Sequence, residues 1–135
     1  MDYLPYRIKS YNNWDLYLHK NQFPYIGRCY ATTLREDAEQ EMNSFEREEL
    51  FEVVIPEWDK AIKQLFNHDK RNLACLGNEW AHLHWHLIPR YNQPRSFYKI
   101  DFIDPNPKGN YSPYPKEEIS LEILMDIKQR IMDKL

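Results

Sequence analysis

The sequence lacks the features of membrane and secreted proteins. It holds no long apolar run, and residues 1–5 show no basic region followed by an apolar stretch. We therefore expect a soluble, cytoplasmic protein without a membrane partner. Only two cysteines are present, Cys29 and Cys75. Both lie in apolar, strand-like runs, so we expect buried, reduced thiols without a chemical role, and a disulfide between them stays an open alternative.

The sequence also lacks an excess of positive charge. It has 18 Lys and Arg against 21 Asp and Glu, which gives a formal net charge of -3. This balance supplies no general attraction for a polyanion, so we expect no nucleic-acid polymer as a partner. A small anionic ligand remains compatible with it, because a local site can be positive on an acidic protein.

The apolar residues that are present suffice for one domain. The 135 residues are 42% hydrophobic and 15% aromatic, which predicts a single domain over residues 1–135 with a sizeable core. Strands are expected at residues 14–20, 28–34, 72–77 and 81–88. In the first of them, Trp14 and Leu16 share one face and are interpreted as core rather than as a base pocket. The last two are close in sequence, which favours an antiparallel pair.

Two helices are expected. Asn43 or Ser44 can cap the main one, and its apolar stripe comprises Leu50, Phe51, Val54, Ile55, Trp58, Ile62, Leu65 and Phe66. Pro56 lacks a backbone donor and should kink or split this helix. The second helix is expected to begin at Pro115 and to continue to the end, with Ile119, Ile123, Ile127 and Ile131 repeating every four residues.

Residues 91–114, ahead of the second helix, are rich in proline. They are predicted to be mostly irregular, with a short strand at residues 97–103. The order of elements predicts an α+β domain: an antiparallel sheet of about five strands, one main helix packed on it, and a C-terminal helix.

A row of histidines marks the fourth strand segment, because residues 82–88 read His-Leu-His-Trp-His-Leu-Ile. Successive side chains of a strand point to opposite faces, so His82, His84 and His86 should share one face. The apolar residues between them are expected to pack on the main helix. Three imidazoles that titrate near neutral pH are then left for solvent or for chemistry. His19 and His68 are interpreted as surface residues without a role.

Three uses of this row are open on the residues alone: phosphate chemistry, metal binding, or a purely structural role. A strand rise of about 3.3 Å per residue puts the outer two Cα atoms roughly 13 Å apart, which makes convergence of three imidazoles on one ion awkward. A zinc site would need a further ligand from His19, His68 or a carboxylate. Phosphate chemistry without a metal or cofactor is therefore favoured.

The run resembles the motif of the histidine triad (HIT) superfamily, in which His-apolar-His-apolar-His is followed by two apolar residues. The Pro-Arg pair after it resembles the diadenosine polyphosphate hydrolase (fragile histidine triad-like) branch more than the nucleoside phosphoramidase branch. Asn21 ahead of Pro24 and Gly27, and Asn78 ahead of the triad, follow the family's order. The resemblance covers roughly residues 14–91.

The resemblance implies an antiparallel sheet with a helix packed on it, paired with a second copy as a homodimer. It implies that His84 attacks the alpha phosphorus of a nucleotide and is transiently nucleotidylated. His86 would contact the phosphate, and His82 would support its neighbours through hydrogen bonds. Asn21 matches a residue that contacts the ribose, and Asn78 approximates one that contacts phosphate. A neutral imidazole, with an unperturbed pKa near 6.5, is a competent nucleophile at pH 7.

Two arginines are further candidates for substrate binding. Arg90 could hold a distal phosphate by a two-pronged hydrogen bond, against the alternative of a solvated charge. Arg28 stands where many family members have a fourth histidine. A permanent cation can replace a hydrogen-bond donor there but cannot shuttle a proton near neutral pH. The glycine-rich segment that usually precedes the triad is shortened to residues 78–81, which also bears on the leaving group.

These observations predict a nucleotide hydrolase or nucleotidyl transferase acting on the alpha phosphate of a nucleotide conjugate. The predicted catalytic residues are His84, His86 and His82, and the predicted substrate-binding residues are Asn21, Asn78, Arg90 and Arg28. The alternative is a nucleotide-binding module with little or no catalysis. Arg28 and the shortened segment motivate that alternative.

Overall fold

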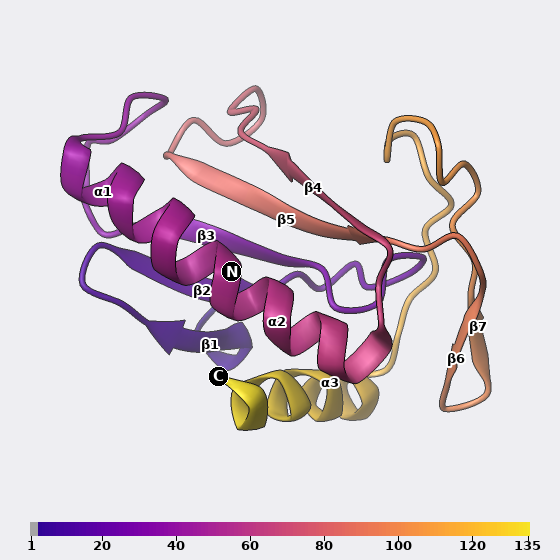
Figure 1. The fold of residues 1–135 in the computed structure, drawn as a ribbon. Coiled ribbons are helices and arrows are strands. Elements are labelled where there is room, and N and C mark those ends of the chain that lie inside the picture. Colours follow the sequence, from indigo (N-terminus) through magenta and orange to yellow (C-terminus); the bar gives the residue numbers. More distant parts are fainter. Residues whose placement is uncertain (1–2) are drawn as a thin grey trace.

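A five-stranded antiparallel sheet forms the centre of the protein, in the order β1-β2-β3-β5-β4 (Figure 1). The computed structural model describes residues 3–135, so residues 1 and 2 of the amino-terminal stretch considered above lie outside it. The strands are β1 (Arg7–Ser10), β2 (Trp14–Leu18), β3 (Cys29–Thr33), β4 (Lys70–Ala74) and β5 (His84–Arg90). The predicted α+β fold with an antiparallel sheet is confirmed.

The alternating segment forms β2 as predicted. Trp14, Leu16 and Leu18 are fully buried on the helix-covered face of the sheet, so the interpretation of the first two as core is confirmed. Strand β1, at the sheet edge, was not predicted. It has four residues with Ile8 as its one buried side chain, and such a short polar segment has no alternation to detect. It pairs with β2 through its backbone.

The main helix runs through three consecutive segments: α1 (Ser44–Glu49), the π-helical turn η2 (Leu50–Val54) and α2 (Ile55–Phe66). Asn43 is the N-cap, and its side chain and that of Glu46 form a reciprocal capping box. Figure 1 shows one continuous rod across the sheet. The helix is neither kinked nor split at Pro56 as predicted; instead it widens into the π turn just before this residue. Pro56 cannot donate to the fourth preceding carbonyl, and the wider turn accommodates that loss.

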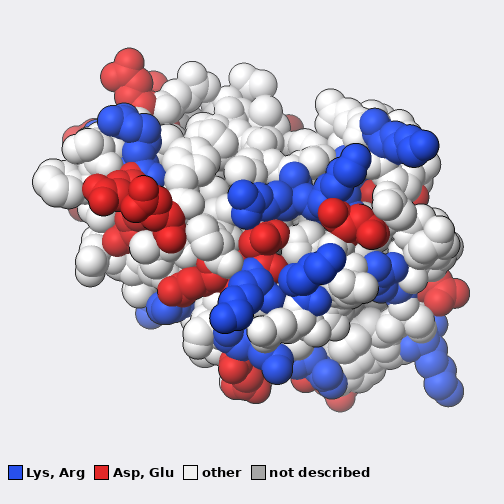
Figure 2. All heavy atoms as spheres, in the orientation of Figure 1, with Lys and Arg blue, Asp and Glu red and all other residues white. Residues whose placement is uncertain are grey.

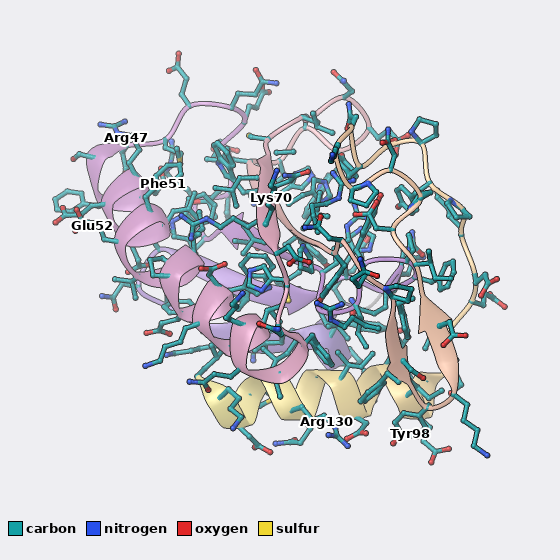
Figure 3. The ribbon with its side chains drawn as sticks, turned by 45° about the vertical axis from the view of Figure 1, so that its right-hand side comes forward. Arg47, Phe51, Glu52, Lys70, Tyr98 and Arg130 are labelled. Carbon is teal, nitrogen blue, oxygen red and sulfur yellow. The ribbon has the colours of Figure 1, made fainter. Side chains whose placement is uncertain are left out.

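The π turn also changes which side chains face the sheet. Leu50, Val54 and Trp58 are fully buried, whereas Phe51 of the predicted stripe is 43% exposed. Figure 3 labels Phe51 on this helix, with Arg47 one turn before it and Glu52 on the opposite side of the helix. The Phe51 ring still meets Trp85 edge-on, with a centroid distance of 5.6 Å. On the face that carries this helix, basic and acidic side chains are interspersed (Figure 2).

The C-terminal helix α3 (Leu121–Lys134) begins later than predicted. Ser120, rather than Pro115, marks its start, because the Ser120 side chain accepts a hydrogen bond from the backbone of Ile123. The exposed residues 115–118 would have no apolar face to bury in a helix. Ile127 and Ile131 are fully buried, and α3 packs on α2 and β1.

The proline-rich segment contains a two-stranded ribbon, β6 (Arg95–Phe97) and β7 (Ile100–Phe102), where a single strand at residues 97–103 was predicted. Tyr98 and Lys99 turn the ribbon with positive φ angles of 52° and 60°. The Tyr98 hydroxyl donates to Asp126 of α3 at 2.6 Å, and Figure 3 shows the ribbon tip close to α3. The ribbon is therefore attached to the C-terminal helix and is separate from the main sheet.

The thiols of Cys29 and Cys75 are free. Cys29 is buried in the core, and burial raises the pKa of its thiol, whereas Cys75 is partly buried. Within residues 3–135, no helix combines the length and apolar character that crossing a membrane requires.

Candidate active site

The histidine row lies where β5 begins. The strand starts at His84 rather than at residue 81, so His82 precedes it, which corrects the predicted strand boundary. The side chains nevertheless alternate between the two faces of the sheet along the row. Leu83 and Leu87 are buried in the helix-covered core, while the rings of His84 and His86 meet edge-on with 5.0 Å between their centroids. In the sheet, His84 lies opposite Thr32 and His86 opposite Tyr30.

Two backbone carbonyls define the tautomers of the first two histidines. His84 Nδ1 lies 2.7 Å from the carbonyl oxygen of His82, and His82 Nε2 lies 2.9 Å from the carbonyl oxygen of Thr33. Because a carbonyl can only accept, the ring nitrogen facing it carries the proton. In neutral His84 the lone pair is therefore on Nε2, the nitrogen that an electrophile can reach.

His86 is held in its neutral form. Burial, the charge of Arg28 and the neighbouring His84 lower the pKa of His86 to about 4. Its Nδ1 atom is buried and has no hydrogen-bond partner within the described part of the chain. Unpaired buried polar atoms are rare and concentrate at functional sites.

His19 belongs to the same cluster, so its interpretation as a surface residue is wrong. Its ring centroid is 5.8 Å from that of His86. The backbone N–H of Asn21 donates to His19 Nδ1 at 3.0 Å, so neutral His19 carries its proton on Nε2. Burial and then Arg28 lower the pKa of His19 well below its ordinary value. One signal in the sequence was its place at the end of β2, just before the predicted ribose contact.

His68 is also buried rather than exposed, at 4% of its surface. Its Nε2 lies 2.7 Å from Asp59 on α2, and its ring packs against Trp58. It does not line the histidine cleft. His68 is therefore a structural residue of the helix-covered side.

Three histidines, His19, His84 and His86, border a cleft with two lobes. The smaller lobe has a volume of about 300 Å³ and is mostly aromatic, and its lining comprises Tyr3, Tyr6, Leu18, His19, Lys20, Tyr30, Glu79, Trp80, His84 and His86. Trp80, which the sequence did not single out, lies 4.7 Å from His84 and 5.4 Å from His82 between ring centroids. His82 thus contacts the cleft through Trp80 and is not part of its lining.

The larger lobe is polar and has a volume of about 510 Å³. It shares His19, Glu79, Trp80, His84 and His86 with the first, and its other lining residues are Asn21, Arg28, Leu76, Gly77, Asn78, Tyr111, Ser112, Pro113, Tyr114 and Lys116. Three predicted substrate-binding residues, Asn21, Asn78 and Arg28, therefore meet beside the histidines. One wall is formed by residues 111–116, a segment for which the sequence predicted no functional role.

The loop that carries His19 and Arg28 is fixed from inside by Gln22. This fully buried side chain donates to the carbonyl oxygens of His19 and Arg28, at 2.7 and 2.8 Å, and accepts from the N–H of Gly27 at 2.7 Å. Gly27 has a φ of 97°, and a Cβ added there would lie 2.9 Å from Ile62. Gln22 is thus a positioning residue that the sequence did not reveal.

Arg90 is the predicted site residue that the structure does not bring to the cleft. Its guanidinium makes five hydrogen bonds: two to Asp104 and one each to Asn72, Asn106 and Gly109. A guanidinium has five N–H donors, so none is left for a phosphate. Arg90 instead joins the end of β5 to residues 104–109.

The alternative of a metal site at the histidine row finds no matching arrangement of side chains in the part of the chain that the structure describes. Among residues 3–135, no group of three or more His, Cys, Asp or Glu side chains is arranged to hold a metal ion.

Comparison with known proteins agrees with this geometry. The HIT domain matches residues 31–93, while no curated protein matches the sequence significantly. A histidine triad protein from Bradyrhizobium japonicum superposes with a TM-score of 0.74 at 20% identity, covering 95% of this chain and 88% of that one. A histidine triad protein from Sinorhizobium meliloti gives 0.73 at 21% identity, covering 96% and 88%.

A third solved structure is that of a hypothetical histidine triad nucleotide-binding protein from Sulfolobus tokodaii. It superposes with a TM-score of 0.69 at 18% identity, covering 96% of this chain and 82% of that one. At such identities the likeness establishes the fold. This chain has the fold of histidine triad proteins and carries a HIT domain match over residues 31–93.

Proposed function

We propose that the protein is a histidine triad nucleotide hydrolase or nucleotidyl transferase that attacks the alpha phosphate of a nucleotide conjugate through His84. One observation carries the proposal: the hydrogen bond from His84 Nδ1 to the His82 carbonyl leaves the Nε2 lone pair free in a cleft large enough for a nucleotide. The HIT domain match supports it. Within the superfamily, we place the protein in the diadenosine polyphosphate hydrolase branch.

The reaction proceeds in two displacements. In the first, the His84 Nε2 lone pair forms a bond to the alpha phosphorus while the bond to the leaving group breaks and its electron pair departs with that group. The Nδ1–H bond to the His82 carbonyl supports the positive charge that develops on the ring. In the second, water attacks phosphorus, loses a proton and displaces the imidazole. Another phosphate as acceptor makes the same step a transfer.

The cleft supplies donors for the charge on the phosphoryl oxygens. His19 offers its Nε2–H as a donor. The ring of His86 is next to it, with 5.8 Å between the two ring centroids. Arg28 and the Asn78 amide border the same lobe. Low pKa values keep His19 and His86 neutral at pH 7, so they act as hydrogen-bond partners that need no reorganisation during the reaction. Asn21 is assigned to the ribose by resemblance.

The test compares the wild-type protein with His84→Asn on dinucleoside polyphosphates and on nucleoside phosphoramidates. Wild-type protein is expected to release mononucleotide and, when quenched early, to show the mass of a nucleotidyl adduct. His84→Asn is expected to show neither. Equal turnover by the two proteins would remove His84 from the mechanism.

A nucleotide-binding module without catalysis is the second candidate. Arg28 favours it, because the guanidinium stands where a proton-shuttling histidine is common in the superfamily. Calorimetry with AMP together with adduct mass spectrometry separates the two. Binding without adduct or turnover would establish the module.

The assembly follows from the resemblance alone, whereas the location is the expectation drawn from the sequence. We propose a homodimer that works in the cytoplasm on a nucleotide or nucleotide conjugate. Sedimentation equilibrium of the purified protein tests the dimer directly: a molecular mass near that of one chain at micromolar concentration would contradict it.

A further inference from the structure

Arg28 is a buried cation without an anionic partner. Its side chain is only 3% exposed, yet no carboxylate within residues 3–135 forms an ion pair with it. The other deeply buried arginine, Arg90, is neutralised by Asp104 at 2.7 Å. Burial of an uncompensated charge is costly, so buried arginines are normally paired. Arg28 departs from that rule at the border of the cleft.

Hydrogen bonding leaves most of the Arg28 guanidinium unused. Nη1 donates to the Tyr114 hydroxyl at 2.7 Å, and Nε is buried without any partner among the described residues. The rings of Tyr111 and Tyr114 flank the guanidinium at 5.6 and 5.3 Å from its central carbon. Aromatic faces hold a guanidinium in place without neutralising its charge. The group is therefore fixed and still able to bind an anion.

The surrounding lobe adds to this positive charge. Lys116 lines the same lobe and lies 5.7 Å from the Tyr114 ring centroid. Glu79, the acidic residue of the lining, is exposed and forms no ion pair with Arg28 or Lys116 in the described structure. A carboxylate therefore does not occupy the place of a ligand.

The wall formed by residues 111–116 is held by side chains of the β2–β3 loop. The Tyr25 hydroxyl donates to the carbonyl oxygen of Tyr111 at 2.7 Å, and Gln22 binds the carbonyl oxygen of Arg28. These bonds place Tyr114 and Lys116, from the far end of the sequence, beside a residue of the β2–β3 loop. A subsite made in this way is pre-formed, which lowers the cost of ordering it on binding.

We propose that Arg28, Tyr114 and Lys116 form a subsite for a phosphate group next to the phosphorus that His84 attacks. This inference rests on the proposed function and specifies its substrates: conjugates whose leaving group begins with a phosphate are preferred over those that release an amine or a neutral alcohol. The phosphate can be part of the conjugate or can be a free phosphate that accepts the nucleotidyl group. Both have the same chemistry at the subsite.

The experiment measures binding in the His84→Asn background, where the ligand is not consumed. AMP and ADP are titrated by calorimetry into this protein and into double variants that also carry Arg28→Gln, Lys116→Gln or Arg130→Gln. ADP is expected to bind about tenfold more tightly than AMP in the background, because charge-assisted hydrogen bonds add to affinity. Arg28→Gln should bring the ratio close to one, and Lys116→Gln should lower it about threefold.

Arg130→Gln is the matched control. Arg130 lies on α3 near the tip of the β6–β7 ribbon (Figure 3) and pairs with Asp126, so its removal should leave the ratio unchanged. Should Arg28→Gln fail to fold, the exposed Lys116 supplies a variant that keeps the core intact. A further arm titrates inorganic phosphate into protein saturated with AMP. If inorganic phosphate binds to the AMP-saturated protein, the subsite takes an acceptor phosphate. If ADP is preferred over AMP but inorganic phosphate does not bind, the subsite takes the phosphate of the leaving group.

Equal affinities for AMP and ADP in the background, with no binding of inorganic phosphate, would overturn the subsite. An ADP preference that survives Arg28→Gln would overturn the role of Arg28. Failure of the proposed function would look different. If the wild-type protein shows no His84-dependent turnover but the His84→Asn background still prefers ADP, the subsite is retained and the enzymatic function is rejected.

Discussion

The Nδ1 atom of His84 lies 2.7 Å from the carbonyl oxygen of His82, so a backbone group determines which nitrogen of His84 is free. Replacing the His82 side chain leaves that carbonyl in place. We expect His82→Gln to lower kcat by about tenfold, and His84→Asn to lower it by at least about a thousandfold. Initial rates on a dinucleoside polyphosphate measure both. Equal losses would show that the His82 ring takes a direct part.

His19 is expected to act as a hydrogen-bond donor to the reacting phosphoryl group. His19→Ala should lower kcat by about tenfold to a hundredfold with a smaller change in KM, because the bond strengthens as charge develops. His19→Gln, which keeps an N–H donor, should recover part of that loss. His68→Gln is the matched control: it should lower the melting temperature through its Asp59 contact and retain kcat. A rise in KM alone for His19→Ala would assign His19 to ground-state binding.

Stability should fall at acidic pH because of His86. Its pKa is about 4 in the folded protein against about 6.5 in the unfolded chain. Between these values the unfolded state binds more protons, so stability rises with pH, is complete above about pH 6.5 and is lost as pH falls towards 4.

Urea unfolding at pH 7 and pH 5 measures this contribution. The free energy of unfolding of the wild type should drop by about 2 kcal/mol more than that of His86→Gln. His19 contributes with the same sign and is present in both proteins, so the burial and Arg28 effects on its pKa are common to them, and the comparison reports His86 together with its effect on His19. Parallel pH profiles of the two proteins would contradict the assignment.

Arg90 is expected to matter for stability and not for the reaction. Arg90→Met leaves Asp104 buried without its partner, which should cost about 3–5 kcal/mol in the free energy of unfolding. The folded fraction should keep its KM for a dinucleoside polyphosphate. Chemical denaturation and steady-state kinetics below the transition give the two quantities. A large rise in KM with little loss of stability would restore Arg90 as a phosphate contact.

Periodic segments account for the parts of the fold that the sequence predicted well. Strand β2 and the main helix bury apolar residues at regular spacings, such as Trp14 with Leu16 and Val54 with Trp58. Strand β1 escaped prediction because Ile8 is its one buried residue. The start of α3 was placed too early because Pro115 suits a first helical turn, whereas Ser120 supplies the side-chain cap.

The site was predictable as far as it depends on one strand. The alternation along residues 82–86 brings His84 and His86 together, and no long-range information is needed for that. Arg28 and Tyr114 are 86 residues apart in sequence, and no local pattern encodes their contact. His19 was missed for a similar reason: its position depends on the loop that the Gln22 side chain holds through the carbonyl oxygens of His19 and Arg28. A buried glutamine cannot be told from an exposed one by sequence pattern.

The segment of residues 104–116 has consequences for how this architecture can diversify. It is held through side chains, by Arg90 at one end and by Tyr25 and Arg28 at the other, and it contributes no strand to the sheet. Substitutions in it can reshape the proposed phosphate subsite while β5 keeps His84 in place. One scaffold can thus acquire a different ligand preference through changes in a single peripheral segment.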